Sequence, residues 1–456
     1  MKLPFYCSVA FSGLLLFAAC KNPSVGNDNP GSPEDSTQTG SALSEDSLLN
    51  LVQKQTFNYF WEGAEPTSGL ARERIHLDNI YPNNDQEVVT TGGSGFGLMA
   101  ILVGIERGFI TREQALERYE KIMNYLGKAD RFYGAWSHWI DGPTGKVHPF
   151  SKKDNGGDLV ETAFLVQGML TVREYFRDGN EREQALVAQI DSLWKGVEWD
   201  WYTHGQDVLY WHWSPQYKWE MNFPVGGYNE CLIMYVLAAA SPTHTIDADV
   251  YHKGWARNDS IISKEKYYDL PLVLNHYEND KAAVGPLFWA HYSYLGLNPK
   301  GLKDKYGDYW ELNRNHALIH YRYCVDNPED HKGYGENCWG LTSSYSMRGY
   351  AGHRPGRDLG VISPTAALSS FPYTPEESMQ FLKFLYSPAR DSLIGKYGPY
   401  DAFSFEKNWY LPRYLAIDQG PIPVMIENYR SGMLWDLFMK APEVRAGLDK
   451  LGFTYE

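Results

Sequence analysis

Cysteine is scarce in this chain of 456 residues, which limits the covalent structure that the protein can have. Of the five cysteines, Cys7 and Cys20 lie in an N-terminal segment of different character, so an odd number remains in the body. An odd number excludes a complete disulfide framework, although a pair between Cys324 and Cys338 stays open. No CxxC spacing points to zinc, and Cys231, at the start of an apolar run, is expected to be a small buried residue.

Long apolar runs and basic clusters are also missing. No internal stretch reaches the roughly 18 uninterrupted apolar residues that a transmembrane helix needs. The 42 Lys and Arg residues are outnumbered by 56 Asp and Glu, the net charge is −14, and the basic residues are dispersed. Binding to a phosphate backbone requires clustered basic residues, so nucleic acid is not an expected partner. A hydrophobic content of 43% is typical of a globular protein.

Aromatic residues, by contrast, are abundant: the chain has 15 Trp, 33 Tyr and 20 Phe. Such side chains can simply fill a core. Trp and Tyr also have flat apolar faces with a polar edge, which suit stacking on sugar rings. The composition therefore slightly favours a carbohydrate ligand.

The N-terminal segment predicts export. Lys2 is followed by an apolar run over residues 4–19, which has the length of a signal-peptide core. The run ends in Leu-Phe-Ala-Ala-Cys, which resembles a bacterial lipoprotein box with Cys20 as the acylated residue; an ordinary signal peptide is the alternative. Residues 20–44 are rich in Pro, Gly, Ser, Asn and Asp, as in a flexible tether. We therefore expect a lipoprotein signal peptide over residues 1–19 and a monomeric body anchored by lipid, facing the periplasm or on the outer membrane.

Helix-period apolar patterns recur along the body from about residue 44. They predict about a dozen helices, at residues 46–62, 94–107, 112–126, 158–176, 181–198, 226–240, 285–296, 309–325, 363–370, 375–386, 422–439 and 442–450. Thr111, Asn180 and Thr374 resemble the first residues of capping boxes. Period-two alternation is confined to residues 145–150 and 207–213, so we expect an all-α body with small β-hairpin excursions.

The predicted helices are of two kinds. Residues 98–103 and 232–240 are apolar nearly all round, as a helix enclosed on every side must be, whereas the helices at 112–126 and 181–198 carry charges on one face. This alternation predicts two concentric layers, and about twelve helices fit a closed toroid of six helical hairpins. The polar, weakly periodic segment 241–284 is interpreted as a long insertion.

Acidic residues gather at the start of one predicted helix. Asp158 and Glu161 lie three apart after two glycines and therefore share a helix face, and Asp154 lies just upstream. The simplest explanation is that carboxylates stabilise a helix N-terminus, by about 0.3–1 kcal/mol each. Glu230 repeats the arrangement after Gly226-Gly227, and Asp418 stands before another apolar helix. If these helices belong to the inner layer, their N-termini share one mouth of the toroid, and the acids face a common cleft.

Aromatic segments are expected to surround the acids. The residues that we expect to contact a substrate there are Trp136, His138, Tyr228 and Trp289. Acids ringed by aromatic side chains suit glycosidic cleavage, because one carboxylic acid protonates the leaving oxygen while a second carboxylate activates water or attacks the sugar.

Competing constellations are weaker. His316 and His320 have the i, i+4 spacing of a zinc pair, but the HExxH glutamate is missing, so a packed or solvated pair is expected. The glycine-rich segment 92–97 lacks the strand of a nucleotide-binding βαβ unit and is interpreted as close helix packing or as one wall of the mouth. Binding of Ca²⁺ by Asp154, Asp158 and Glu161 stays open, without an EF-hand pattern.

Four segments together resemble a bacterial glucoamylase-like family whose members act on β-1,2-glucans, glycoside hydrolase family 144. They are residues 91–97, 154–161, 227–230 and 417–421, and the resemblance runs from about residue 45 to the C-terminus. It implies an (α/α)6 barrel over residues 45–456 and an inverting mechanism with no metal and no cofactor. By the same resemblance Glu230 is the general acid and Asp418 the base, acting directly or through a water or substrate hydroxyl. Asp154, Asp158 and Glu161 would line the subsites, and Glu161 is a rival for a catalytic role.

The expected substrate is a β-1,2-linked glucooligosaccharide. The family includes endo-acting enzymes and exo-acting enzymes that release sophorose from the non-reducing end. Because segment 241–284 could block one end of the cleft, we expect exo action, with endo action on long β-1,2-glucan as the alternative. A non-catalytic surface glycan-binding lipoprotein and a retaining transglycosylase are further alternatives.

Overall fold

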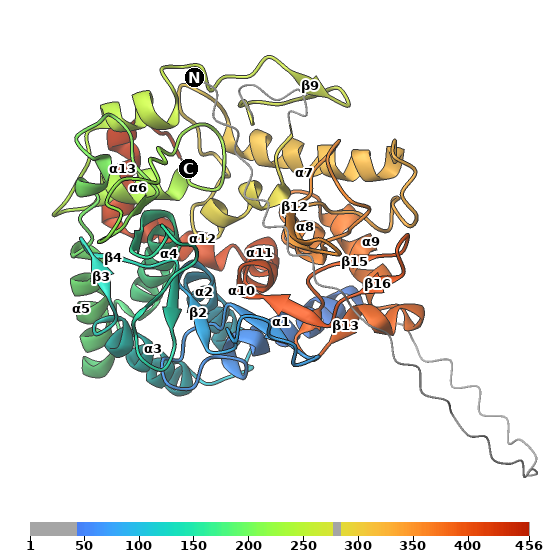
Figure 1. Cartoon of the computed structure of the whole chain (residues 1–456), viewed down its shortest axis with the longest axis horizontal. Helices are drawn as coiled ribbons and strands as arrows, with labels where there is room; N and C mark the ends of the chain where they lie inside the picture. The colour runs from blue at the N-terminus through green and yellow to red at the C-terminus, as the bar shows by residue number, and fades with distance from the viewer. Residues whose placement is uncertain (1–42, 277–283, 456) are drawn as a thin grey trace, which may run out of the picture. The chain divides into compact units, whose positions relative to one another are not determined.

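The computed structural model describes residues 43–276 and 284–455 (Figure 1). The predicted signal peptide, the predicted lipidation site Cys20 and the tether up to residue 42 lie outside these residues. The first helix begins at Glu45, next to the predicted start of the folded body, and Ser44 caps it by accepting a hydrogen bond from the Ser47 N–H. No helix in the described part of the chain has both the length and the apolar character needed to cross a membrane.

The described residues are mostly helical, which confirms the predicted class. The α-helices are α1 (Glu45–Trp61), α2 (Thr91–Glu106), α3 (Arg112–Leu126), α4 (Leu159–Phe176), α5 (Glu181–Lys195), α6 (Leu232–Ala240), α7 (Tyr309–Asp326), α8 (Pro364–Leu368), α9 (Pro375–Leu385), α10 (Ala416–Gln419), α11 (Pro421–Arg430), α12 (Met433–Lys440) and α13 (Pro442–Leu451). Shorter helical turns are η1 (Trp201–Thr203), η2 (Val250–Trp255), η3 (Leu287–Ala290), η4 (Tyr292–Tyr294) and η5 (Pro388–Leu393).

The strands are two to four residues long and pair as antiparallel ribbons, with one three-stranded sheet of order β2-β5-β6. They are β1 (Arg74–His76), β2 (Val88–Thr90), β3 (Arg131–Phe132), β4 (Ala135–Trp136), β5 (Trp139–Asp141), β6 (Val147–His148), β7 (Gly157–Asp158), β8 (His212–Trp213), β9 (Lys266–Tyr267), β10 (Leu270–Pro271), β11 (Ser343–Ser346), β12 (Gly349–Gly352), β13 (Ile394–Gly395), β14 (Gly398–Pro399), β15 (Phe403–Ser404), β16 (Trp409–Tyr410) and β17 (Arg413–Leu415). The two predicted β excursions correspond to β6 and β8.

Several predicted boundaries were wrong. The helix expected over 226–240 begins only at Leu232, the helix expected over 285–296 is replaced by η3 and η4, and the one over 422–439 is broken into α11 and α12. The break falls at Gly432, whose φ of 76° ends a right-handed helix. The capping boxes at Thr111 and Asn180 are confirmed, but Thr374 does not cap α9, because its hydroxyl donates to the carbonyl of Ser370 instead.

Helices α2, α4 and α6 are buried almost all round, whereas α3 and α5 bury one face only. α4 contacts both α2 and α6, and α3 and α5 pack beside them toward the edge (Figure 1). α2 and α4 meet at their main chains: a Cβ at Gly95 would collide with the carbonyl of Phe164, and a Cβ at Gly168 with the carbonyl of Gly95. Glycine therefore permits a closer approach than any other residue would.

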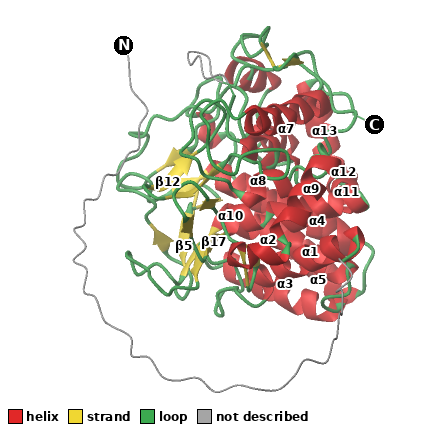
Figure 2. Ribbon diagram, turned by 90° about the vertical axis from the view of Figure 1, so that its right-hand side faces the viewer, coloured by secondary structure: helices red, strands yellow, loops and turns green. Residues whose placement is uncertain are grey.

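Three strands lead directly into helices on one side of the molecule. β2 continues into α2, β7 into α4 and β17 into α10, and Figure 2 shows β5, β12 and β17 on one side of the helices. β1 pairs with β17, with Arg74 opposite Leu415, and β7 pairs with β8, with Asp158 opposite His212. These junctions bring residues from distant parts of the chain to the same side as the helix N-termini.

The three cysteines of the body are buried and free. The pair between Cys324 and Cys338 that the sequence left open is therefore not formed. The burial of Cys231 agrees with its prediction as a small core residue.

Candidate active site

Asp158, at the start of α4, accepts three hydrogen bonds. It caps α4, where Oδ1 accepts a hydrogen bond from the Glu161 N–H at 2.9 Å. Its Oδ2 accepts hydrogen bonds from His138 Nδ1 and from Trp211 Nε1, both at 2.9 Å. With no exposed surface and three donors, Asp158 fixes the positions of its neighbours.

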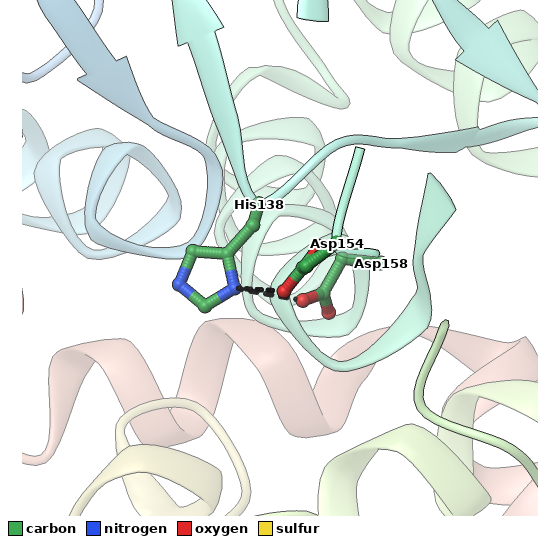
Figure 3. Close-up of side chains that lie close together, drawn as sticks. All are labelled: His138, Asp154 and Asp158. Carbon is green, nitrogen blue, oxygen red and sulfur yellow. Dashed lines mark hydrogen bonds and ion pairs between the residues drawn. The ribbon is translucent and has the colours of Figure 1, made fainter. Parts of the chain in front are cut away.

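His138 lies among three acidic side chains, and Figure 3 shows its Nδ1 edge facing Asp154 and Asp158. Nδ1 is 2.9 Å from Asp158 Oδ2 and 3.7 Å from Asp154 Oδ2, while Nε2 is 3.9 Å from Glu161 Oε1. Burial lowers the pKa of His138, but the charge of Glu161, the hydrogen bond to Asp158 and the other acidic charges outweigh burial and raise the pKa to about 10. His138 is therefore an imidazolium at neutral pH, and it offsets the negative charge of the acids.

Asp154 and Glu161 bind protons more tightly than exposed acids do. Burial raises the pKa of each to about 7, against the charge of His138, which lowers both. Glu161 Oε2 accepts a hydrogen bond from the Gly92 N–H in the first turn of α2, at 2.7 Å. Asp154 Oδ1 is 3.3 Å from Nε2 of His212, whose pKa burial lowers to about 4. The cluster thus joins the starts of α2 and α4.

The same cluster has the spacing of a metal site. One nitrogen or oxygen atom each of His138, Asp154 and Asp158 lies within 4.8 Å of the others. A histidine binds a metal through a neutral nitrogen, so a metal there would have to displace the proton that the acids hold on His138.

Glu230 lies in a bend just before α6 rather than within the predicted helix. Gly227, with a φ of 82°, turns the chain ahead of it, and the Ser293 hydroxyl donates a hydrogen bond to the Glu230 carbonyl. The residue is 9% exposed, and burial raises the pKa of its carboxyl group to about 7 although hydrogen bonds from its own backbone and from Cys231 lower it. A carboxyl group in this state holds a proton near neutral pH, as a general acid must.

Asp418 lies in the first turn of α10, and neither of its carboxyl oxygens has a hydrogen-bond partner among the described residues. Asp401, whose charge acts on Asp418, lies in the loop after β14. Both are 2% exposed. Burial and then the charge of Asp401 raise the pKa of Asp418 well above its usual value, and burial raises that of Asp401 to about 6. The sequence pointed to Asp418 through the Gly-Pro turn that follows it but gave no signal for Asp401.

Tyr292 is the residue around which the predicted acids meet. It begins η4, is 6% exposed and packs against the rings of Phe96 and Phe288. Burial, together with the charges of Asp418, Glu230 and Glu161, raises the pKa of its phenol. Contacts support this placement: the next residue, Ser293, donates a hydrogen bond to the Glu230 carbonyl, and the ring of Phe164, three residues after Glu161, lies 5.6 Å from the Tyr292 ring. The structure therefore brings together acids from three distant parts of the chain.

The predicted aromatic contacts are placed less favourably. Trp136 is wholly buried, with its indole N–H donating to the Leu126 carbonyl, and Tyr228 is 1% exposed with its hydroxyl donating to Asn313. Neither has surface to offer a ligand, so the predicted substrate contacts of Trp136 and Tyr228 do not fit the structure. Trp289, 8% exposed, packs edge-on against Tyr228. His138, by contrast, contacts the acid cluster directly, with Nδ1 2.9 Å from Asp158 Oδ2.

Two residues that sequence reasoning missed also lie here. Phe150 is 48% exposed and stacks on His138, with ring centroids 4.1 Å apart. Its place four residues before Asp154 was the only available signal. Glu73 is 6% exposed, and its carbonyl accepts a hydrogen bond from the Ala416 N–H at 3.0 Å, two residues before Asp418. Only the pairing of β1 with β17 brings it there, so the sequence held no local signal for it.

Comparisons with known proteins agree on one family. The family model described as "Putative glucoamylase" matches residues 222–442. An endo-β-1,2-glucanase from Chitinophaga pinensis, solved with sophorotriose and glucose, is 64% identical, with a TM-score of 0.89 over 91% of this chain and 99% of that one. A β-1,2-glucanase structure from Parabacteroides distasonis is 45% identical, with a TM-score of 0.85 over 90% of this chain and 60% of that one.

A curated relative adds a second mode of action. The exo-β-1,2-glucooligosaccharide sophorohydrolase (non-reducing end) of Parabacteroides distasonis is 47% identical over 426 residues. That alignment covers 90% of this chain, but the chain spans only 58% of the relative's length.

Proposed function

The chain belongs to the bacterial glucoamylase-like family, glycoside hydrolase family 144, and from this premise we propose that it hydrolyses β-1,2-glucosidic bonds of β-1,2-glucans or their oligosaccharides. The observation that carries the proposal is the group of buried acids around Tyr292, with the pKa of Glu230 raised to about 7. Cleavage of a glycosidic bond needs one carboxyl group that holds a proton and another group that removes a proton from water. Burial among aromatic rings supplies the first of these conditions.

Within this proposal Glu230 is the general acid that protonates the leaving oxygen. Asp418 is the general base, which removes a proton from the attacking water directly or through a second water or a substrate hydroxyl, and the anomeric configuration is inverted. Glu161 is the rival for a catalytic role, because burial gives it a similarly raised pKa of about 7. The imidazolium of His138 offsets the charge of Asp154, Asp158 and Glu161. Asp154 and Glu161 line the adjacent subsites, whereas Asp158, predicted as a substrate contact, has no exposed surface and instead positions His138.

The mode of attack on the chain is a finer proposal. Endo action is favoured by the 64% identity to the endo-β-1,2-glucanase, which this chain covers almost completely. Exo release of sophorose, the mode expected from segment 241–284, is the second candidate, and the curated relative favours it. In the structure this segment contacts the loop before Glu230: the Gly227 N–H donates to the Trp255 carbonyl at 2.7 Å, and Arg257 donates to the Gly226 carbonyl at 2.6 Å.

One experiment tests the activity and its mode together. The purified protein is incubated with β-1,2-glucan and with short β-1,2-glucooligosaccharides, and reducing ends and product lengths are followed. Endo action gives oligomers of mixed length early in the reaction, and exo action gives sophorose alone. Binding of the glucan without new reducing ends would instead indicate a glycan-binding lipoprotein. NMR identifies the anomer that forms first, and this distinguishes an inverting hydrolase from a retaining transglycosylase.

The architecture and the cellular location complete the proposal. We propose that residues 45–456 form an (α/α)6 barrel, which the alternation of buried α2, α4 and α6 with one-sided α3 and α5 supports. We also propose a monomer that is anchored to a bacterial membrane by acylated Cys20, facing the periplasm or on the outer membrane. Release of the Cys20→Ala protein from the membrane fraction would support the anchor, and unchanged retention would contradict it.

A further inference from the structure

Phe150 is an exposed aromatic side chain at the acid cluster, and the catalytic scheme gives it no role. It is 48% exposed, and its ring stacks on the imidazole of His138 with the centroids 4.1 Å apart and the planes 20° apart. Single exposed apolar side chains are common on protein surfaces, so exposure alone indicates nothing. Which face of the ring is open, and how firmly the ring is held, decide whether it can serve a ligand.

The positions of three rings show which face of Phe150 is open. The centroid of Trp139 lies 4.8 Å from that of Phe150, with the planes 72° apart, and 6.0 Å from that of His138. With 4.1 Å between Phe150 and His138, these separations form a nearly right-angled triangle with Phe150 at the corner. His138 therefore covers one face of the Phe150 ring and Trp139 lies at its edge, which leaves the opposite face as the exposed surface.

The backbone around Phe150 holds the ring in place. The Phe150 N–H donates a hydrogen bond to the Asp154 carbonyl at 3.0 Å, and the Asp154 N–H donates to the Ser151 carbonyl at 3.1 Å, so the segment closes on itself. Two residues before Phe150, His148 lies opposite Trp139 in the pairing of β5 with β6. The ring is thus positioned before any ligand arrives, and binding does not have to order it.

The polar groups next to this ring suit a neutral sugar. Asp154 is 5% and Glu161 6% exposed, and the His138 side chain is 18% exposed, so each keeps some surface beside the ring. In a β-linked glucosyl unit the ring substituents are equatorial, so both faces of the sugar present C–H groups while the hydroxyl groups project from the rim. A flat apolar ring beside carboxylate acceptors matches this arrangement, because the C–H face can stack while the hydroxyl groups donate hydrogen bonds.

We propose that Phe150 is the aromatic platform of one glucosyl subsite, where its open face stacks on a sugar ring whose hydroxyl groups bond to Asp154 or Glu161. This inference rests on the proposed action on β-1,2-glucans and names a residue that determines substrate affinity. A phenyl ring transfers no proton, and a sugar stacked on it is bound equally well before and during the reaction. The contact should therefore lower KM and leave kcat almost unaffected.

Three substitutions of Phe150 separate stacking from mere covering of His138. Each is made in the wild type for kinetics and in Glu230→Gln for calorimetric titration with short β-1,2-glucooligosaccharides. Phe150→Ala should raise KM and Kd about tenfold and change kcat less than about twofold. Phe150→Leu covers His138 with a similar apolar volume but has no flat face, so its affinity should fall nearly as far. Phe150→Tyr keeps the flat ring and should restore most of the affinity.

Tyr429 provides a matched control among the exposed aromatic residues. It is 43% exposed and rests on the ring of Phe371, with the centroids 5.5 Å apart, in the last turn of α11, at the end of that helix away from α10. Tyr429→Ala removes a comparable exposed ring away from the acids. Its KM and Kd should equal those of the parent protein.

The other outcomes are equally informative. Parental affinity in Phe150→Leu would overturn the proposal, because an apolar cover for His138 would then suffice, and so would an equal loss of affinity in Tyr429→Ala or a fall in kcat with Kd unchanged. If Phe150→Ala does not fold, the comparison of Phe150→Leu with Phe150→Tyr still decides. If the wild type binds the oligosaccharides through Phe150 but releases no reducing ends, the proposed hydrolysis fails and the platform stands. If it binds none of them, the platform is refuted as well.

Discussion

Replacement of Glu230 by Gln should abolish hydrolysis while making the protein more stable. An amide cannot protonate the leaving oxygen, and loss of a general acid typically slows a reaction by about 10²–10⁴-fold, or about 3–5 kcal/mol of activation free energy. Gln has the shape of Glu and keeps the bend before α6, so KM should change little. The reducing-end assay on β-1,2-glucooligosaccharides measures both constants.

The gain in stability follows from the sign of the pKa shift. Burial raises the pKa of Glu230 from 4.5 to about 7, so the folded state binds the proton more tightly than the unfolded state. Below pH 4.5 both states are protonated and the shift costs nothing. As the pH rises from 4.5 to 7, Glu230 ionises in the unfolded state but stays protonated in the folded state. This ionisation stabilises the unfolded state and lowers the free energy of unfolding of the wild type by about 3 kcal/mol. Because Gln does not titrate, urea unfolding at pH 8 should show Glu230→Gln to be the more stable protein, and the difference should vanish near pH 4.

Glu427 offers a matched control with the opposite sign. It is 1% exposed, and its carboxylate pairs with Arg107 at 2.6 Å near the other end of α2. Burial raises the pKa of Glu427, but hydrogen bonds from Arg107, Ser431 and Gln53 outweigh burial and lower it. Its stabilising effect is thus present above pH 4.5 and is lost as the pH falls through the folded value. Glu427→Gln should lose stability at pH 8 and keep its kcat.

A Glu230→Gln protein as active as the wild type would refute the role of Glu230 as general acid. A Glu230→Gln protein that is no more stable than the wild type at pH 8 would refute the claim that burial raises the pKa of Glu230.

Three further predictions concern the cluster around His138. In Gly92→Ala the new Cβ would lie 2.5 Å from Glu161 Oε2 and 2.9 Å from the Phe164 ring. We therefore expect kcat to fall at least tenfold and the free energy of unfolding, measured in urea, to fall by about 1–3 kcal/mol. Full activity of Gly92→Ala would show that the position of Glu161 is unimportant. Asp158→Ala removes a helix cap worth about 0.5–2 kcal/mol and also a hydrogen-bond partner of the His138 imidazolium. An NMR titration should therefore give a lower pKa for His138 in the variant than in the wild type, where the acids raise it to about 10. Equal pKa values in the two proteins would contradict the contact between His138 and Asp158. Dialysis against EDTA should leave kcat unchanged, because a protonated His138 has no free lone pair for a metal, and activity restored by a divalent cation would disprove this.

The helices that could be predicted as buried are those whose own residues are apolar on every face. α2, α4 and α6 are apolar all round, and that pattern alone identified them as enclosed helices. The start of α6 was misplaced because Gly226 and Gly227 were interpreted as the start of the helix, whereas Gly227, with a φ of 82°, turns the chain before it. Hydrogen bonds from Arg257 and to the Trp255 carbonyl, some 30 positions away, hold those residues out of the helix.

The site shows the same division between local and distant information. Asp158 and Glu161 stand at a helix start, where acids, glycines and the following apolar run lie within one short segment. Glu73 and Asp401 come to the site only through strand pairing and a loop, which a single sequence does not reveal. The aromatic predictions were least reliable, because composition does not tell which ring faces a cleft: Trp136 faces the core, whereas Phe150 lies open beside His138.

The glycines at positions 95 and 168 have a consequence for the redesign of this protein. Main-chain atoms of α2 and α4 are in contact there, so the distance between these two helices is not set by side chains that could be exchanged for smaller or larger ones. The hydrogen bond from the Gly92 N–H to the Glu161 carboxylate joins the same two helices. New preferences for substrate length should be sought in the connecting segments around the opening, while this pair of helices is left untouched as the fixed frame.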